Sequence, residues 1–125
     1  MAVSALVLIG ALMGGCRTWK WTSFEWGNES VQELYVSSAA GFSERISPGW
    51  LSPGRGRATV AGLDLGDPVR VDKNIMIRWK IGNEEHEQVW TRSQSGLSKV
   101  LNGVTVRFTY QTNGTWRIEQ LKQAQ

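Results

Sequence analysis

Cysteine and histidine are nearly absent from this chain, with one of each in 125 residues. A single thiol cannot form a disulfide within the chain, so a hydrophobic core has to stabilise the fold. The chain also lacks a large excess of charge of one sign, because it has 14 Lys and Arg and 11 Asp and Glu. The basic residues are spread along the sequence. That spread argues against a nucleic-acid groove, and no nucleic-acid partner is expected.

The sequence also lacks an apolar run long enough to cross a membrane. Residues 2–13 carry no charge, but a helix of about 12 residues rises only roughly 18 Å, against ~30 Å for a bilayer core. This length suits the apolar segment of a cleaved export signal. Two small residues, Gly14 and Gly15, then precede Cys16.

The segment Leu12-Met13-Gly14-Gly15-Cys16 resembles the lipobox of bacterial lipoproteins. The resemblance implies that a signal peptide is cut off between Gly15 and Cys16, and that Cys16 receives a lipid containing palmitate. It also implies that this lipid anchors the protein in the membrane of the cell envelope. Arg17 follows the cysteine, where Asp would be the usual signal for inner-membrane retention, so an outer-membrane location is implied in a diderm bacterium. Two alternatives stay open: an ordinary secretory signal, and an apolar N-terminal strand or helix of a cytoplasmic domain.

These boundaries leave material for one domain. We expect a signal peptide over residues 1–15, an acylated cysteine and linker over 16–22, the domain over 23–122 and a frayed tail over 123–125. Seven tryptophans are available to fill the core, and each can bury about 150–250 Å².

Alternation of apolar and polar residues predicts short strands rather than helices. The clearest strand is 75–81, followed by a turn at Gly82-Asn83 and a returning strand over 84–91. A second hairpin joins strands near 104–110 and 115–121 through Asn113-Gly114. Shorter strands are expected at 31–38, 57–63 and 69–71. The predicted core of the two hairpins consists of Ile75, Ile77, Trp79, Ile81, Val106, Phe108 and Trp116, joined by Phe24 and Trp26.

About seven or eight strands at spacings of roughly ten residues predict an all-β fold, a single antiparallel β-sandwich. The architecture resembles the small β-sandwich lipoproteins of bacterial envelopes, either immunoglobulin-like or transthyretin-like. No residue motif carries this second likeness, so it implies no activity.

Catalytic and metal-binding motifs are weak. His86 lies within Glu84-Glu85-His86-Glu87, but in a strand only Glu84 and His86 share a face, which is too few ligands for a metal. A Gly-x-Ser-x-Gly elbow is missing from the sequence. No catalytic residue, metal ion or cofactor is expected.

The irregular stretch from Pro48 to Arg57 is the best candidate for partner contact, because loops on a rigid sandwich often bind. It supplies Trp50, Arg55 and Arg57. An alternative places Trp50 as a plug at one end of the sandwich. Trp19 and Trp21 stay open between the membrane interface and the core.

These features together predict a lipid-anchored, non-enzymatic envelope lipoprotein that acts as a binding module for an envelope protein or glycan. The alternatives are an accessory lipoprotein of a secretion or envelope complex, and an immunity protein against a periplasmic toxin.

Overall fold

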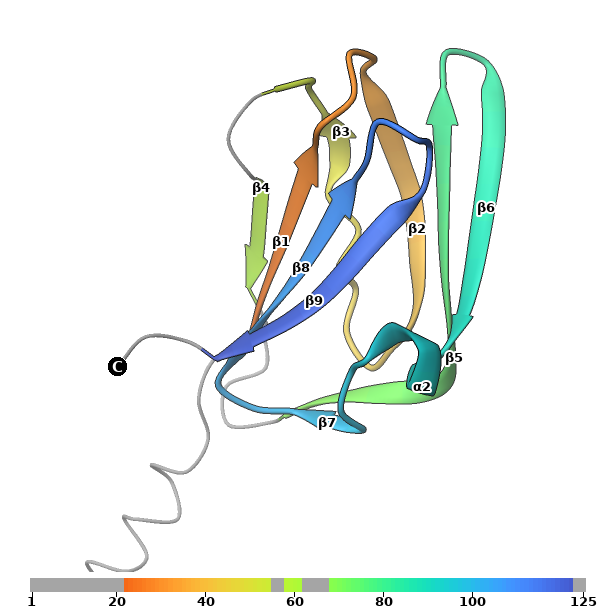
Figure 1. Cartoon of the computed structure of the whole chain (residues 1–125). Coiled ribbons are helices and arrows are strands. Elements are labelled where there is room, and N and C mark those ends of the chain that lie inside the picture. Colours follow the sequence, from red (N-terminus) through yellow and green to blue (C-terminus); the bar gives the residue numbers. More distant parts are fainter. Residues whose placement is uncertain (1–21, 55–57, 62–67, 123–125) are drawn as a thin grey trace, which may run out of the picture.

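The computed structural model describes residues 22–54, 58–61 and 68–122 (Figure 1). Strands dominate it, with one short helix. In chain order the elements are β1 (Ser23–Asn28), β2 (Leu34–Phe42), β3 (Gly49–Leu51), β4 (Ala58–Ala61), β5 (Val69–Ile81), β6 (Glu84–Thr91), α2 (Arg92–Ser95), β7 (Val100–Leu101), β8 (Val104–Tyr110) and β9 (Trp116–Lys122).

The strands form two sheets that face each other as a β-sandwich, which confirms the predicted fold class. One sheet has the order β4-β1-β8-β9, and the other has the order β3-β2-β5-β6 with β7 paired to the start of β5. All pairs are antiparallel except β1 and β8, which run parallel. The prediction of a wholly antiparallel sandwich is therefore wrong for β1, which runs parallel to β8.

The period of two along the strands places the core where the sequence predicted it. Ile75, Ile77 and Trp79 of β5 are buried, whereas Arg78 between them is exposed. Ile81 is only partly buried, because it lies at the end of its strand. Val106, Phe108 and Trp116 from the facing sheet are buried with them, and so are Phe24 and Trp26 of β1.

Both predicted hairpins are present. Gly82 has a φ of 63° in the turn between β5 and β6. The turn between β8 and β9 spans five residues, because the strands end at the Tyr110–Trp116 pair. Only Gly114 has a positive φ there, and Asn113 instead accepts hydrogen bonds through Oδ1 from the backbone N–H and hydroxyl of Thr115. Asn113 thus acts as a side-chain acceptor.

Several elements differ from the sequence-based expectation. The strands expected at 69–71 and 75–81 are one continuous strand, β5, because the backbone stays extended from the residues that pair with β7 to those that pair with β6. Within the strand expected at 57–63, Ala58–Ala61 form β4, and residues 57, 62 and 63 lie outside the described residues. The expected strand 31–38 begins and ends later, as β2, with Leu34 and Val36 buried as predicted. Trp19 and Trp21 lie outside the described residues.

Helix α2 was not predicted, although its capping signal is present in the sequence. The Thr91 hydroxyl accepts from the Gln94 N–H at 3.1 Å, and the Gln94 side chain accepts from the Thr91 N–H at 2.9 Å. This reciprocal pair is a capping box, and Gly96 ends the turn with a φ of 77°. Four residues are too few for helical periodicity to be visible.

Candidate functional site

The outer face of the β3-β2-β5-β6 sheet carries a pair of exposed aromatic side chains. Trp50 of β3 pairs with Tyr35 of β2, and Tyr35 pairs in turn with Lys80 of β5. Residues opposite each other on neighbouring strands project from the same face. The two rings meet edge to face with centroids 4.9 Å apart, yet 66% of Trp50 and 36% of Tyr35 stay exposed. Two large rings therefore stand together in solvent.

Strand alternation holds Trp50 in this position. Its neighbour Leu51 points into the core and is 4% exposed, so Trp50 has to point outward. The Leu51 carbonyl oxygen accepts a hydrogen bond of 3.1 Å from Nδ2 of the buried Asn28. Gly49 begins β3 with a φ of 81°, a conformation that a residue with a Cβ rarely adopts. The backbone at Trp50 is thus held by β3 and by the burial of Leu51, which directs the indole outward.

An open cleft of about 520 Å³ lies beside the two rings. Its lining is Glu33, Tyr35, Trp50, Lys80 and Gly82, which we call the aromatic cleft. Aromatic faces pack against flat apolar surfaces of a ligand, while a few charged groups fix its orientation. The aromatic cleft combines both kinds of group, since one carboxylate and one ammonium flank the rings.

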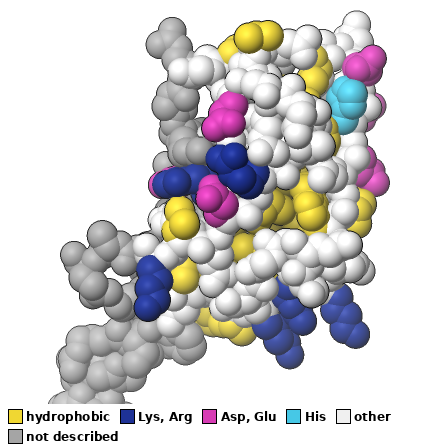
Figure 2. Space-filling view, in the orientation of Figure 1, with side chains coloured by type: hydrophobic (Ala, Val, Ile, Leu, Met, Phe, Trp, Pro, Cys, Tyr) yellow, Lys and Arg dark blue, Asp and Glu magenta, His cyan; other side chains and the backbone are white. Residues whose placement is uncertain are grey.

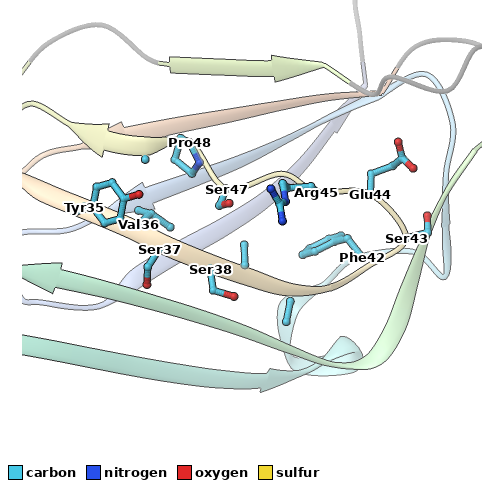
Figure 3. A pocket seen from close by; sticks show the side chains of 13 residues that line it. Tyr35, Val36, Ser37, Ser38, Phe42, Ser43, Glu44, Arg45, Ser47 and Pro48 are labelled. Carbon is cyan, nitrogen blue, oxygen red and sulfur yellow. The ribbon is translucent and has the colours of Figure 1, made fainter.

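A second, more polar groove of about 720 Å³ runs along β2 (Figure 3). Among the described strands, β3 pairs only with residues 34–36 of β2, so the rest of β2 faces the return over residues 43–48. Figure 3 shows Arg45 and Ser47 on that return, across the groove from Ser38 on β2. Tyr35 lines both hollows. The aromatic cleft and the polar groove therefore meet at this ring.

Charged residues on the outer face of β5 and β6 are matched across the strands. Lys80 lies opposite Glu85, and Arg78 lies opposite Glu87. Arg78 Nη2 and Glu87 Oε1 are 2.9 Å apart, with nearly half of each side chain exposed. An exposed pair of this kind contributes only about 0.2–1 kcal/mol to stability. Acidic residues of β6 thus lie opposite the basic face of β5.

His86 points inward, away from the aromatic cleft. Its ring stacks on Trp79 with centroids 5.5 Å apart and an interplanar angle of 18°. His86 Nε2 lies 3.0 Å from Glu84 Oε1, which is within ion-pair distance, but the two groups are not oriented to form a hydrogen bond. Within the part of the chain that the structure describes, no three His, Cys, Asp or Glu side chains are grouped to hold a metal ion.

Of the residues predicted to contact a partner, the structure describes Trp50 alone. It is exposed at the aromatic cleft, so the alternative that it plugs one end of the sandwich is wrong. Arg55 and Arg57 lie outside the described residues, as do Gly15 and Cys16.

The sequence reasoning missed Tyr35, Lys80 and Glu33 as neighbours of Trp50. Part of the signal was present, because Tyr35 lies between the inward residues Leu34 and Val36 and must point outward. Which strands lie side by side cannot be read from such local patterns. The aromatic cleft draws its residues from three strands and their turns.

No protein-family model, no curated protein and no solved structure matches this chain. No helix in the described ranges has the length and apolar character needed to span a membrane.

Proposed function

We propose that this chain is a non-enzymatic bacterial lipoprotein, anchored through a lipid on Cys16 at the periplasmic face or surface of the outer membrane, which binds an envelope glycan at the aromatic cleft. The paired exposed rings of Trp50 and Tyr35 are the observation that carries the binding part. The lipobox-like segment ending in Cys16 supports the anchor.

Glycan chemistry suits the aromatic cleft better than a purely apolar ligand does. One face of a sugar ring is apolar and can pack on an exposed indole, while its hydroxyl groups need polar partners. Lys80 donates hydrogen bonds and Glu33 accepts them at the same cleft. A rigid strand also limits the ordering cost on binding, because Trp50 is already positioned.

The anchor is tested by metabolic labelling with palmitate. Label is expected in the wild-type protein and not in Cys16→Ala, because only the thiol at that position can be acylated. Mass spectrometry that finds an intact Met1 on a protein released into the soluble fraction would contradict the anchor.

The binding site is tested by co-sedimentation of the protein with purified peptidoglycan. Trp50→Ala and Tyr35→Ala should each weaken binding by about tenfold, as expected for truncating a central aromatic contact. Val89→Ala is the matched control, because Val89 is also an exposed residue of the same sheet's outer face. Equal binding by all four proteins, with unchanged melting temperatures, would refute the glycan site. Capture of a protein by wild type but not by Trp50→Ala would replace the glycan with a protein partner.

A further inference from the structure

Basic side chains from separate stretches of the chain gather at one end of the sandwich. A hollow of about 300 Å³ there is lined by Arg70 and Lys73 of β5, Arg92 of α2 and Lys99 just before β7, together with the acidic Asp72. We call these four basic residues the basic end. In Figure 2, Lys and Arg side chains project from the lower end of the molecule. Residues that are scattered in the sequence thus form one charged surface.

Hydrogen bonds hold the stretches of the basic end together. The Val71 N–H donates to the Lys99 carbonyl oxygen at 2.9 Å. Nη1 of Arg92 donates to the Val71 carbonyl oxygen at 2.8 Å. Arg70 lies opposite Val100 in the β5–β7 pair. Three members of the cluster therefore lie on β5 or α2, and the backbone of Lys99 is hydrogen-bonded to β5.

The four cations of the basic end outnumber the one carboxylate, Asp72, that lines the same hollow, in contrast to the paired arginines on the faces of the sheets. Arg78, Arg107 and Arg117 each pair with a glutamate at 2.9 to 3.8 Å, and Figure 2 shows such mixed charges midway along the molecule. Among residues 22–54, 58–61 and 68–122, no member of the basic end forms an ion pair. This end therefore presents a net positive surface.

The chain enters the sandwich beside the basic end. The Thr22 hydroxyl donates to the Leu101 carbonyl oxygen at 3.1 Å, and Leu101 pairs with Val69 next to Arg70. Cys16 precedes Thr22 by six residues, and a chain of that length extends at most about 20 Å. A lipid on Cys16 would keep the basic end near the bilayer surface.

We propose that the basic end docks on the anionic headgroups of phospholipids in the anchoring membrane. This proposal rests on the lipid anchor at Cys16. Phosphate groups complement the unpaired cations, and each Lys or Arg close to an anionic surface strengthens binding by about fivefold. Val100, which is 46% exposed beside Lys99, supplies an apolar contact at the same surface. A lipid chain and a basic patch together make an anchor that neither makes alone.

The test uses the acylated protein, reconstituted into nanodiscs of phosphatidylcholine alone or of phosphatidylcholine with phosphatidylglycerol. Lysine acetylation by a water-soluble reagent is followed by mass spectrometry. Lys73 and Lys99 should react at least about threefold more slowly in the anionic discs, and 0.5 M salt should remove this protection because it screens the charges. Lys80, at the far end of β5, is the internal reference and should react equally in both discs.

Equal reactivity of Lys73 and Lys99 in the two discs would overturn the docking while leaving the anchor intact. Protection by inorganic phosphate in neutral discs would assign the basic end to a free anion and also overturn the docking. Protein that carries no acyl chain and fails to enter either disc would refute the anchor and, with it, the docking. A second measurement is hydrogen exchange of the backbone amides of residues 97–101, which should be slower in the anionic discs than in the neutral ones. The double variant Lys73→Gln/Lys99→Gln should show the same exchange rate in both discs.

Discussion

Two buried tryptophans differ in one hydrogen bond, and this difference can be measured. Trp26 is 0% exposed and its Nε1 donates to the Ile46 carbonyl oxygen at 3.0 Å. Trp79 is 3% exposed, but its Nε1 has no acceptor among the described residues. Replacing either residue by Phe removes the same ring atoms. Only Trp26→Phe leaves a buried carbonyl oxygen without its partner.

The expected magnitudes follow from this contrast. Both variants lose packing contacts. The ring centroids of Trp26 and Phe108 are 4.1 Å apart, and the ring centroid of Trp79 lies 5.7 Å from that of Tyr110 and 5.8 Å from that of Trp116. An unsatisfied buried acceptor adds about 1–3 kcal/mol. Trp26→Phe should therefore lower the free energy of unfolding by about 1–3 kcal/mol more than Trp79→Phe does.

Urea unfolding at 25 °C, followed by circular dichroism, measures this difference. The midpoints give the free energies if the m-values agree, which also checks that the unfolded states are comparable. Circular dichroism is preferred to fluorescence because both substitutions remove an emitting indole. Equal losses in the two variants would refute the assigned hydrogen bond from Trp26 to the segment before β3.

Other substitutions test the two faces of β5, the close approach of Gly41 to β5 and the hydrogen bonds of Asn28, each by the same urea assay. Trp79→Ala should cost about 3–5 kcal/mol, whereas Arg78→Ala on the opposite face should cost under ~1 kcal/mol; equal costs would mean that the β5 faces are misassigned. Gly41→Ala should cost more than ~2 kcal/mol, since a Cβ would lie 2.5 Å from a backbone oxygen at a φ of 106°. Gly54→Ala is its control, having a positive φ but open space, and an equal cost would refute the clash. Asn28→Ala should cost about 1–3 kcal/mol, because its side chain bonds two carbonyl oxygens; a neutral result would contradict that role.

The parts of the fold set by local alternation could be predicted from the sequence. Strand 84–91 was predicted with the observed bounds, because alternation along 75–81 defines the first strand and the turn at Gly82-Asn83 returns the chain beside it. The bulges in β2 could not be predicted in this way. Register shifts occur between Val36 and Ser38 and between Ala40 and Phe42, where Gly41 passes close to the backbone of β5. That closeness depends on a strand more than 30 residues away.

Of the aromatic cleft, only Trp50 could be predicted from the sequence, and its neighbours could not. Trp50 stood out because it lies between two Pro-Gly turns. Its outward direction follows from β3, where the neighbouring Leu51 is buried and accepts a hydrogen bond from Asn28 through its carbonyl oxygen. The basic end illustrates the same limit more strongly, because even spacing of Arg and Lys along the chain indicated no cluster. Folding brings β5, α2 and β7 together and concentrates the charge.

The two proposed surfaces lie at opposite ends of one strand, and this arrangement links the anchor to the binding site. Arg70 belongs to the basic end and Lys80 to the aromatic cleft, ten residues apart along β5, or up to about 33 Å in extended backbone. With a tether of about 20 Å at most, docking of the basic end would orient β5 away from the bilayer. The aromatic cleft would then face material beyond the membrane surface. Loss of docking would leave the affinity for a soluble glycan fragment unchanged but would lower binding to an intact peptidoglycan layer, because orientation would no longer be fixed.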